Sequence, residues 1–349
     1  MVWTGCPRVS RPARYLPGAE RSVDHRVGRS RVSTPKLLGV LVTFRRPRDL
    51  ETSLAVLSDQ KHLLDRLVVV DNDPTPLGEQ IVAAADGAAA EVVYLPMMEN
   101  AGFPGGLAAG IETLLAAAAD SDWIVVLDDD DPPDSFTVLG ELLNFAEQAV
   151  AADPHTAAVG LRGARFDRRR GLLRRVSTSD LEGHVPVDCI AGNALPLYRA
   201  SALRRAGSFL GPLFFSHEEL EIGLRLEAAG FALYADGVQW RRRRTANDRP
   251  DVADESRWEL LHPNWRSYYS LRNTVFVLRQ HGRRGTALKV GVVRGLLKPM
   301  LHLPVHPSAA LRALRINRRA FLDGWRERLG RRMEPDVSVP RPKRTVTTA

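Results

Sequence analysis

Four short apolar runs alternate with helix-like segments in the first half of the chain, and each run ends at polar residues. The runs are Leu37–Phe44, Leu67–Val70, Val92–Leu95 and Ile124–Leu127. Short, continuously apolar runs are typical of strands buried on both faces of a parallel sheet. Leucines at helical spacing in residues 49–57 and an apolar stretch over 107–119 predict helices between the strands. The pattern therefore predicts an α/β fold, with right-handed crossovers and a mostly parallel sheet flanked by helices.

The densest acidic group follows the fourth run directly, as Asp128 to Asp131. Open α/β sheets bind their ligands at the carboxyl ends of parallel strands. Adjacent carboxylates repel one another unless a cation neutralises them. Oxygen ligands suit Mg²⁺ or Mn²⁺, which in turn binds phosphate. We therefore expect a divalent metal site here, with a solvated acidic turn as the alternative.

Two further groups fall at predicted strand ends. Asp71 ends the second run, where a carboxylate is well placed to hydrogen-bond a ribose or a base. A turn-capping Asp is nearly as common at such a position. Residues 100–106 are rich in glycine and precede a predicted helix, so their backbone N–H groups can approach a phosphate closely. A glycine-rich turn is weak support by itself.

The second half is predicted to contain a strand at 157–161, a basic loop or hairpin at 166–175 and helices at 134–148 and 265–280. The Gly192-Asn193 pair interrupts an extended apolar segment, which indicates close approach of a ligand. Glu218, Glu219 and Glu221 open a helix that ends near Gly230. Acids in a first turn also complement the helix dipole, which is a sufficient structural reason for two of them.

The charge is distributed unevenly over the 349 residues, whose net charge is +8. Residues 1–36 carry +6 and residues 283–349 carry +12, which leaves −10 for residues 37–282. A basic chain can bind nucleic acid, but here the excess lies outside the expected sheet, so no nucleic-acid partner is expected. Basic residues beside the apolar face of residues 288–303 fit an anionic membrane surface, although a helix packed on the rest of the protein is equally ordinary.

The cysteine content and the length of the apolar segments indicate in which cellular compartment the protein is expected. Two cysteines cannot build a disulfide framework, which indicates a reducing compartment. No apolar segment is long enough to span a bilayer, and no secretory leader is recognised. We expect a cytoplasmic protein, at the inner face of the cell membrane if the basic flanks bind lipid.

Taken in order, the motifs resemble those of the inverting family 2 glycosyltransferases. The matching motifs are Thr43 to Pro47, Val69 to Asn72, Asn100 to Gly106, Leu127 to Asp131, Gly192-Asn193, His217 to Arg225 and Gly230-Phe231. Bacterial galactofuranosyl- and rhamnosyltransferases of cell-wall assembly are the most similar members, since their DDD motif reads as Asp128 to Asp130 does here. The resemblance implies a GT-A type, Rossmann-like fold with a helical C-terminal extension.

The resemblance also implies roles for individual residues. Glu219 is expected to be the catalytic base, with Glu218 beside it, and Asp128 and Asp130 are expected to bind Mg²⁺ or Mn²⁺. The expected donor-binding residues are Thr43, Phe44, Arg46, Asp71, Asn100, Gly102, Gly105, Asp128 and Asp129. The expected acceptor-binding residues are Gly192, Asn193 and His217. Arg272 and Asn273 are expected to buttress the acceptor side rather than to catalyse.

One departure from the family pattern concerns the metal. Relatives often carry a further metal-binding His after the strand that follows the base helix, but here residues 234–240 run into Arg241 to Arg244. Three alternatives stay open. The metal relies on Asp130, phosphates and water; His217 or His262 substitutes; or the arginines neutralise the diphosphate directly. A solvated charged loop is an equally ordinary interpretation of the arginines.

These expectations define domains and a function. Residues 1–35 are expected to be a disordered extension, 36–281 the transferase domain, 282–332 a helical and membrane-associating region, and 333–349 a disordered tail. The expected partners are a UDP-galactofuranose or dTDP-rhamnose donor and a cell-envelope glycan or lipid-linked acceptor. A sugar nucleotidyltransferase is the rival enzyme, but residues 37–48 lack its glycine-rich signature. A degenerate sugar-nucleotide-binding protein, tethered to a membrane or nucleic acid, is the rival without catalysis.

Overall fold

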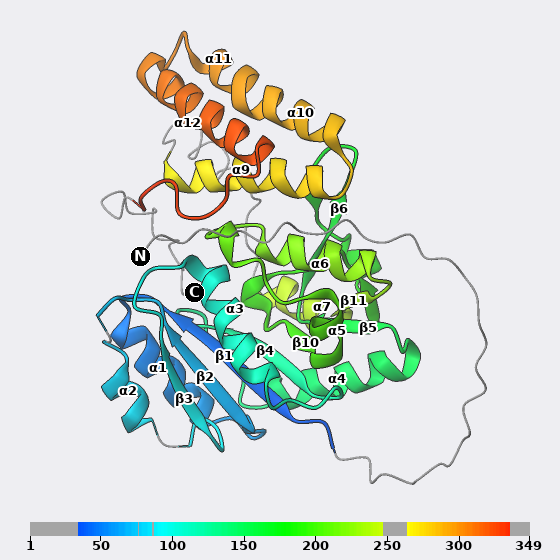
Figure 1. Cartoon of the computed structure of the whole chain (residues 1–349). Helices are drawn as coiled ribbons and strands as arrows, with labels where there is room; N and C mark the ends of the chain where they lie inside the picture. The colour runs from blue at the N-terminus through cyan, green and yellow to red at the C-terminus, as the bar shows by residue number, and fades with distance from the viewer. Residues whose placement is uncertain (1–33, 76, 86, 247–263, 336–349) are drawn as a thin grey trace, which may run out of the picture. The chain divides into compact units, whose positions relative to one another are not determined.

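A mostly parallel sheet forms the centre of the computed structural model, which describes residues 34–75, 77–85, 87–246 and 264–335. Within them, eight strands follow the order β3-β2-β1-β4-β10-β5-β11-β8 (Figure 1). The first four are β1 (Leu37–Thr43), β2 (Arg66–Asp71), β3 (Val92–Pro96) and β4 (Trp123–Asp128), and their pairings are all parallel. The α/β fold predicted from the apolar runs is confirmed.

The register of these strands brings three of their carboxyl ends together. Thr43 of β1 pairs with Asp71 of β2, and Val42 of β1 pairs with Asp128 of β4. Because β1 lies between β2 and β4, the chain crosses over in opposite directions from it. Such a switch point leaves a crevice at the carboxyl edge of the sheet. The groups predicted at separate strand ends therefore line one edge.

The helices of this half are α1 (Pro47–Ser58), α2 (Glu79–Ala84), α3 (Gly102–Leu115) and α4 (Val138–Ala152). The prediction of a helix over 107–119 was wrong at both ends, because α3 already includes the glycines expected to form a loop. Those glycines let α3 lie close to the sheet. A Cβ on Gly106 would lie 2.7 Å from Val42, and one on Gly110 would lie 2.5 Å from Val40.

The second half adds short strands and helices around the carboxyl edge. They are β5 (Thr156–Gly160), β6 (Gly163–Asp167), β7 (Leu172–Arg174), η1 (Thr178–Asp180), β8 (His184–Pro186), β9 (Cys189–Ile190), η2 (Gly192–Ala194), β10 (Leu197–Arg199), α5 (Ala200–Ala206), η3 (Gly211–Leu213), α6 (Glu218–Ala228), β11 (Ala232–Asp236) and α7 (Gly237–Ala246). The basic segment at 166–175 is a hairpin, since β6 pairs with β7 in antiparallel fashion.

The run Arg241 to Arg244 lies on a helix, α7, rather than on the charged loop that we considered. The side chain of Asp236 accepts hydrogen bonds from the backbone N–H groups of Val238 and Gln239, both at 3.0 Å, and so satisfies donors at the start of this helix.

The C-terminal region is helical, as predicted. It contains α9 (Trp265–Gln280), α10 (Arg284–Val292), the π-helical turn η4 (Val293–Leu297), α11 (Lys298–His302) and α12 (Pro307–Trp325). The bounds of α9 match the prediction, whereas the single helix expected at 288–303 begins earlier and contains η4. The Tyr268 hydroxyl of α9 donates to Asp323 Oδ2 of α12 at 2.7 Å, and Figure 1 shows α9 between the sheet and α10 to α12.

Two apolar cores result, one around the sheet and one around α6, α9 and α12. In the described part of the chain, no helix has the length and hydropathy needed to cross a membrane. The predicted N-terminal extension up to residue 33 and the tail from residue 336, like His262, lie outside the described residues.

Candidate active site

The acidic run at the end of β4 brings three carboxylates together. Asp128, Asp129 and Asp130 each present an oxygen within 4.8 Å of the others. Asp129 is buried and already bound: its Oδ2 accepts the Thr43 hydroxyl at 2.8 Å, and its Oδ1 accepts Arg46 Nη1 at 2.9 Å. Arg46 also donates to Asp130 Oδ2 at 2.5 Å. The middle carboxylate therefore holds the loop between β1 and α1, and the outer two flank it.

Asp128 has the electrostatic environment of a cation ligand. It is half-buried, and no hydrogen bond to its carboxylate is found within the described residues. Burial, together with the charges of Asp130 and Asp129, raises the pKa of Asp128 to about 7. A bound divalent cation would favour the charged form and offset this repulsion. The donor set, carboxylate oxygens alone, fits Mg²⁺ or Mn²⁺.

Asp71 at the end of β2 is buried and engaged by its own loop. Its Oδ1 accepts the backbone N–H of Asp73 at 3.1 Å, and its Oδ2 accepts the N–H of Gly78 at 3.0 Å and the Tyr94 hydroxyl at 2.8 Å. This is the turn-capping geometry that the sequence left open. A carboxylate offers about four acceptor sites, so one remains for a nucleotide hydroxyl, and that contact stays a prediction.

The glycine-rich start of α3 lies against the segment that leads into α6. Gly102 has φ +76°, and its N–H donates to Asn100 Oδ1 at 2.9 Å. A Cβ on Gly102 would lie 2.0 Å from the carbonyl oxygen of Phe214, so no other residue fits there. Asn72, which the sequence did not single out, donates to the Gly102 carbonyl at 2.8 Å. Packing accounts for Gly102, and the donor contacts of Asn100, Gly102 and Gly105 stay predictions.

The two glutamates open α6 beside η2, which packs against β4. Glu219 is half-buried, and its Oε1 accepts the backbone N–H of Gly192 at 3.1 Å. Glu218 is buried, and its Oε2 has no hydrogen-bond partner. Burial raises the pKa of both side chains, and the charges of Glu219 and Asp128 raise that of Glu218 further. The glutamate pair and the end of β4 therefore border one region.

His217 and Asn193, predicted to bind the acceptor, are both engaged with other side chains. His217 Nδ1 lies 2.8 Å from the Ser216 hydroxyl and Nε2 lies 3.0 Å from the Thr274 hydroxyl. Burial, with a contribution from Arg294, lowers the pKa of His217 to about 4, so the ring is neutral at pH 7. Asn193 is exposed and accepts a hydrogen bond from Arg162. With both ring nitrogens occupied, His217 is a poor substitute for the missing metal ligand.

The arginines of α7 are also largely engaged. Arg243 forms a bidentate pair with Asp134 at 2.5 Å, and Arg241 lies 3.1 Å from Glu182. Arg244 donates to the Val176 carbonyl at 3.0 Å. These contacts hold α7 beside the loop that follows the acidic cluster, which favours a structural role over direct neutralisation of a diphosphate.

Comparisons with known proteins identify the family of the chain. A model of glycosyl transferase family 2 matches residues 40–204. Galactofuranosyltransferase GlfT1 of Mycobacterium tuberculosis (strain ATCC 25618 / H37Rv) is 30% identical over 263 residues, which cover 72% of this chain and 84% of the relative. GlfT1 of Mycolicibacterium smegmatis is 30% identical over 265 residues, covering 72% and 85%. The chain belongs to glycosyltransferase family 2.

Two solved glycosyltransferase structures are similar to this chain at low sequence identity. A mannosyltransferase from Pyrobaculum calidifontis, in complex with GDP-Man and Mn²⁺, is 15% identical with a TM-score of 0.45, over 85% of this chain and 87% of that one. GalNAc-T7 with UDP, GalNAc and Mn²⁺ is 13% identical with a TM-score of 0.45, over 58% and 42%.

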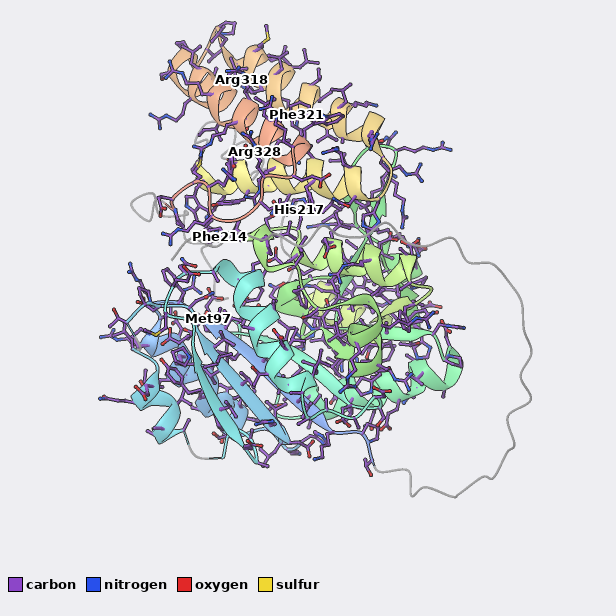
Figure 2. The ribbon with its side chains drawn as sticks, viewed as in Figure 1. Met97, Phe214, His217, Arg318, Phe321 and Arg328 are labelled. Carbon is purple, nitrogen blue, oxygen red and sulfur yellow. The ribbon has the colours of Figure 1, made fainter. Side chains whose placement is uncertain are left out.

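The family 2 model ends at residue 204, before the glutamates of α6. The position of these glutamates in this glycosyltransferase is therefore described from the segment that precedes α6. Three residues before α6 have positive φ without being glycine: Phe214 at 62°, Ser216 at 70° and His217 at 69°. Such backbone is strained and persists only when its surroundings hold it. Figure 2 shows Phe214 and His217 at the junction between the sheet and α9.

Two buried residues of α9 hold this strained segment. Asn273 Nδ2 lies within hydrogen-bond distance of the carbonyls of Leu213, Phe215 and Ser216, at 3.1, 2.7 and 2.8 Å. Arg272 donates to the Leu213 carbonyl at 2.6 Å. The resemblance predicted a buttress here, but no sequence signal shows which carbonyls it binds, since they lie some 60 residues earlier.

Proposed function

We propose that this protein transfers a sugar from a nucleoside-diphosphate donor to a hydroxyl of a cell-envelope glycan or lipid-linked acceptor, with inversion at the anomeric carbon. One observation carries the proposal: Glu219 accepts the N–H of Gly192 in η2, and η2 packs against β4, whose end carries the acidic cluster, so the cluster and the glutamate pair border a common region. That region lies beside the carboxyl ends of β1, β2 and β4, where open α/β sheets bind ligands.

Relatives that are 30% identical and act as galactofuranosyltransferases support a furanose donor. UDP-galactofuranose is therefore our first choice of donor, and dTDP-rhamnose the second. Thr43, Phe44 and Arg46 of the β1–α1 loop and Asp71 of β2 are proposed to contact the donor.

Asp128 and Asp130 would hold Mg²⁺ or Mn²⁺. When bound, the ion neutralises the diphosphate and so stabilises the leaving group. Asp129 has a different task, because it fixes Thr43 and Arg46 through its two oxygens. The loop that it fixes is then pre-organised at the edge of the sheet before the donor arrives.

Glu219 is proposed as the base. The N–H of Gly192 orients its Oε1, which leaves Oε2 to accept the proton of the acceptor hydroxyl as that hydroxyl attacks. Burial raises the pKa of Glu219, and a base works best when its pKa approaches the working pH. A single displacement inverts the anomeric centre, so no second nucleophilic carboxylate is required. Glu219 is also more accessible to an acceptor than the buried Glu218.

We further propose that the reaction takes place in the cytoplasm, at the inner face of the cell membrane. A lipid-linked acceptor would be presented there. The net charge of +12 on residues 283–349 supports this location, because the cytoplasmic leaflet carries anionic lipids.

The test uses the full chain with a panel of sugar nucleotides and Mn²⁺, Mg²⁺ or a chelator. We expect metal-dependent transfer, or slow hydrolysis without acceptor, from one donor. Glu219→Gln should lower turnover by about 10²–10⁴-fold, the usual contribution of a positioned base, and Asp130→Asn should abolish the response to metal. Glu227→Gln, an exposed position on the same helix, should be near normal.

Near-normal turnover of Glu219→Gln would remove the base assignment. Donor binding by the wild-type protein without any turnover would favour the degenerate, non-catalytic alternative.

A further inference from the structure

The outer side of α10, η4 and α11 is apolar. Its exposed side chains, named here the apolar stripe, are Leu288, Val292, Leu296, Leu297, Met300 and Leu301. Leu301 is 78% exposed. The inner side of the same segment is already packed, since a Cβ on Gly291 would lie 2.2 Å from Phe321 of α12. An exposed apolar face of this extent marks an interaction surface on a protein.

The charge of this region has a single sign. No Asp or Glu occurs between residues 260 and 322, whereas residues 283–322 contain nine Lys or Arg. Lys289 and Lys298 are exposed within the apolar stripe, and Arg312, Arg315 and Arg318 are exposed on α12. Like charges at this density repel one another, so they favour an anionic partner.

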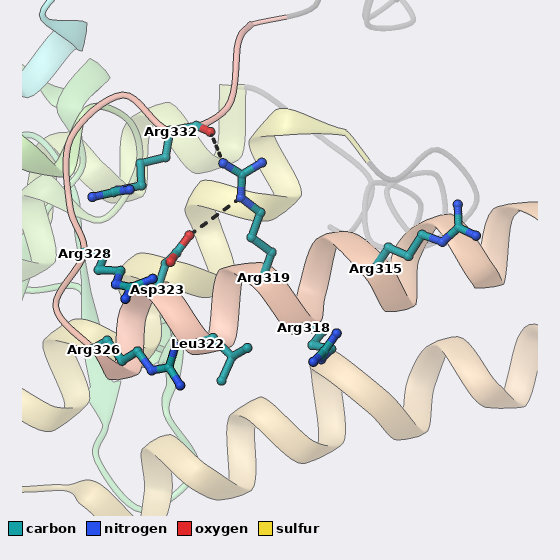
Figure 3. A pocket seen from close by; sticks show the side chains of 8 residues that line it. All are labelled: Arg315, Arg318, Arg319, Leu322, Asp323, Arg326, Arg328 and Arg332. Atoms are coloured by element: carbon teal, nitrogen blue, oxygen red, sulfur yellow. Dashed lines mark hydrogen bonds and ion pairs between the residues drawn. The ribbon is translucent and has the colours of Figure 1, made fainter.

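A pocket of about 370 Å³ concentrates this charge on α12 and the loop that follows it (Figure 3). Its lining, named here the arginine pocket, consists of Arg315, Arg318, Arg319, Leu322, Asp323, Arg326, Arg328 and Arg332. Asp323 already accepts the Tyr268 hydroxyl at 2.7 Å and lies 3.8 Å from Arg319. The lining thus contains six arginines and one carboxylate, and guanidinium groups suit the oxygens of a phosphate.

We propose that α10, η4, α11 and α12 dock on an anionic phospholipid bilayer. The apolar stripe enters the layer between the head groups, and the arginine pocket binds lipid phosphates. The lysines within the stripe reach the head-group level while their methylene stems lie along apolar surface. This inference gives the proposed membrane contact a defined surface, and vesicle binding needs no sugar nucleotide, so its failure would leave the proposed transfer chemistry standing.

Charge complementarity favours a bilayer over a second copy of the chain. A second copy would place the same positive surface opposite itself, with no carboxylate between residues 260 and 322 to pair with it. An anionic bilayer offers apolar depth and negative charge together, which matches both observations.

The test is flotation of the full chain with vesicles of phosphatidylcholine alone or mixed in equal parts with phosphatidylglycerol. We expect strong binding to the mixed vesicles and weak binding to the neutral ones. Leu296→Asp with Leu297→Asp should weaken binding by about tenfold or more, because both apolar side chains are lost to the interface. Arg315→Ala with Arg318→Ala should weaken binding to the mixed vesicles alone, by about tenfold or more.

Matched controls separate these effects from general changes in charge or folding. Leu63→Asp with Leu77→Asp alters leucines that are 46% and 49% exposed, against 47% and 48% for Leu296 and Leu297. Arg48→Ala with Arg205→Ala alters exposed arginines of α1 and α5. Both controls should bind as the wild type does.

Three outcomes would overturn the inference. Equal binding to both kinds of vesicle would exclude a role for the charge. A dimer that Leu296→Asp with Leu297→Asp dissociates, together with no vesicle binding, would make the stripe a self-interface. Thermal stabilisation by inorganic phosphate, lost in Arg315→Ala with Arg318→Ala and again without vesicle binding, would make the pocket a site for free anions.

Discussion

The three aspartates that end β4 have different environments although they are identical in sequence. Asp129 is buried under the β1–α1 loop and bound by Thr43 and Arg46. The charge of Asp128, by contrast, is repelled by the other carboxylates of the run, which raise its pKa. Asp128 ends β4, whereas Asp129 and Asp130 belong to the turn that follows it, so each carboxylate has its own partners although their oxygens lie within 4.8 Å of one another. At the residue scale, the middle residue of the motif supports the β1–α1 loop, and metal binding by the outer two stays a prediction.

The first prediction concerns the pH dependence of transfer. Burial raises the pKa of Glu219 above its ordinary value of 4.5. Burial also raises the pKa of the neighbouring Glu218, and the charge of Glu219 raises it further. A base must be ionised to act, so kcat/KM should rise with pH through the raised pKa of the pair and fall on the acid side. Because two coupled groups titrate together, this limb belongs to the pair rather than to one residue.

The variant Glu218→Gln tests the coupling directly. The charge of Glu219 raises the pKa of Glu218, so Glu218 still holds its proton when Glu219 ionises, and its replacement by a neutral amide should leave the acid limb of the kcat/KM profile nearly in place. Glu227→Gln, exposed on the same helix, should leave the limb where it is. A limb that moves to lower pH in Glu218→Gln would show that Glu218 is the carboxylate that ionises first, which would contradict this order.

At the scale of elements, α9 is the support of the candidate base. It has no residue among the predicted ligands, yet Arg272 and Asn273 are fully buried and bind the carbonyls of the strained segment before α6. The strained backbone turns the chain so that the start of α6 lies against Gly192, and the hydrogen bonds from α9 offset the energetic cost of the strain.

Asn273→Ala tests this role of α9. The substitution removes the donor to the carbonyls of Phe215 and Ser216, whereas Leu213 keeps its hydrogen bond from Arg272, so the free energy of unfolding should fall by about 2–4 kcal/mol. Turnover should fall as the glutamates lose their orientation, while the KM for the donor, bound at the other side of the crevice, should change little. Gln280→Ala, exposed at the end of the same helix, should affect neither quantity. A loss confined to donor KM would contradict the assignment.

At the scale of the whole molecule, two apolar cores are joined through α6 and α9. Residues of α6 contribute to both cores, and Tyr269 of α9 holds the loop after α12 by accepting the N–H of Arg332 at 3.0 Å. Buried hydrogen bonds from α9 also reach the 213–216 segment. The C-terminal helices are therefore continuous with the transferase fold rather than an appendage to it.

Cooperative unfolding is the expected consequence. Trp123 lies in the sheet, and Trp265 and Trp325 lie in the C-terminal helices. We expect tryptophan fluorescence and far-ultraviolet circular dichroism to report one coincident transition in denaturant. Two separated transitions would show that the helical layer unfolds independently, and α9 would then not act as a rigid support.

Sequence alone was sufficient for the parallel strands β1 to β4 and for the acidic edge, whereas the short strands β8 and β10 were not predicted. A short, uninterrupted apolar run is buried on both faces as a central strand of a parallel sheet. Polar groups that follow such strands therefore lie together at the carboxyl edge of the sheet. It was insufficient for α3, where glycines read as a loop are helical because close packing on Val40 and Val42 requires them. It was also insufficient for Arg241 to Arg244, which α7 carries as a helix.

The tertiary structure alone decided which side chains are free to act. His217 and Asp71 were both expected to bind substrate. Ser216 and Thr274 engage the ring nitrogens of His217, and Tyr94 and backbone N–H groups engage Asp71, which keeps one acceptor site, so both roles stay predictions. Asn72 was not singled out and Asn273 was expected only as a buttress, and the folded chain shows which segment each one holds. Local pattern determines where strands and helices form, because that depends on near neighbours in the chain. Hydrogen-bond partners are chosen among residues far apart in sequence, and only the folded chain brings them together.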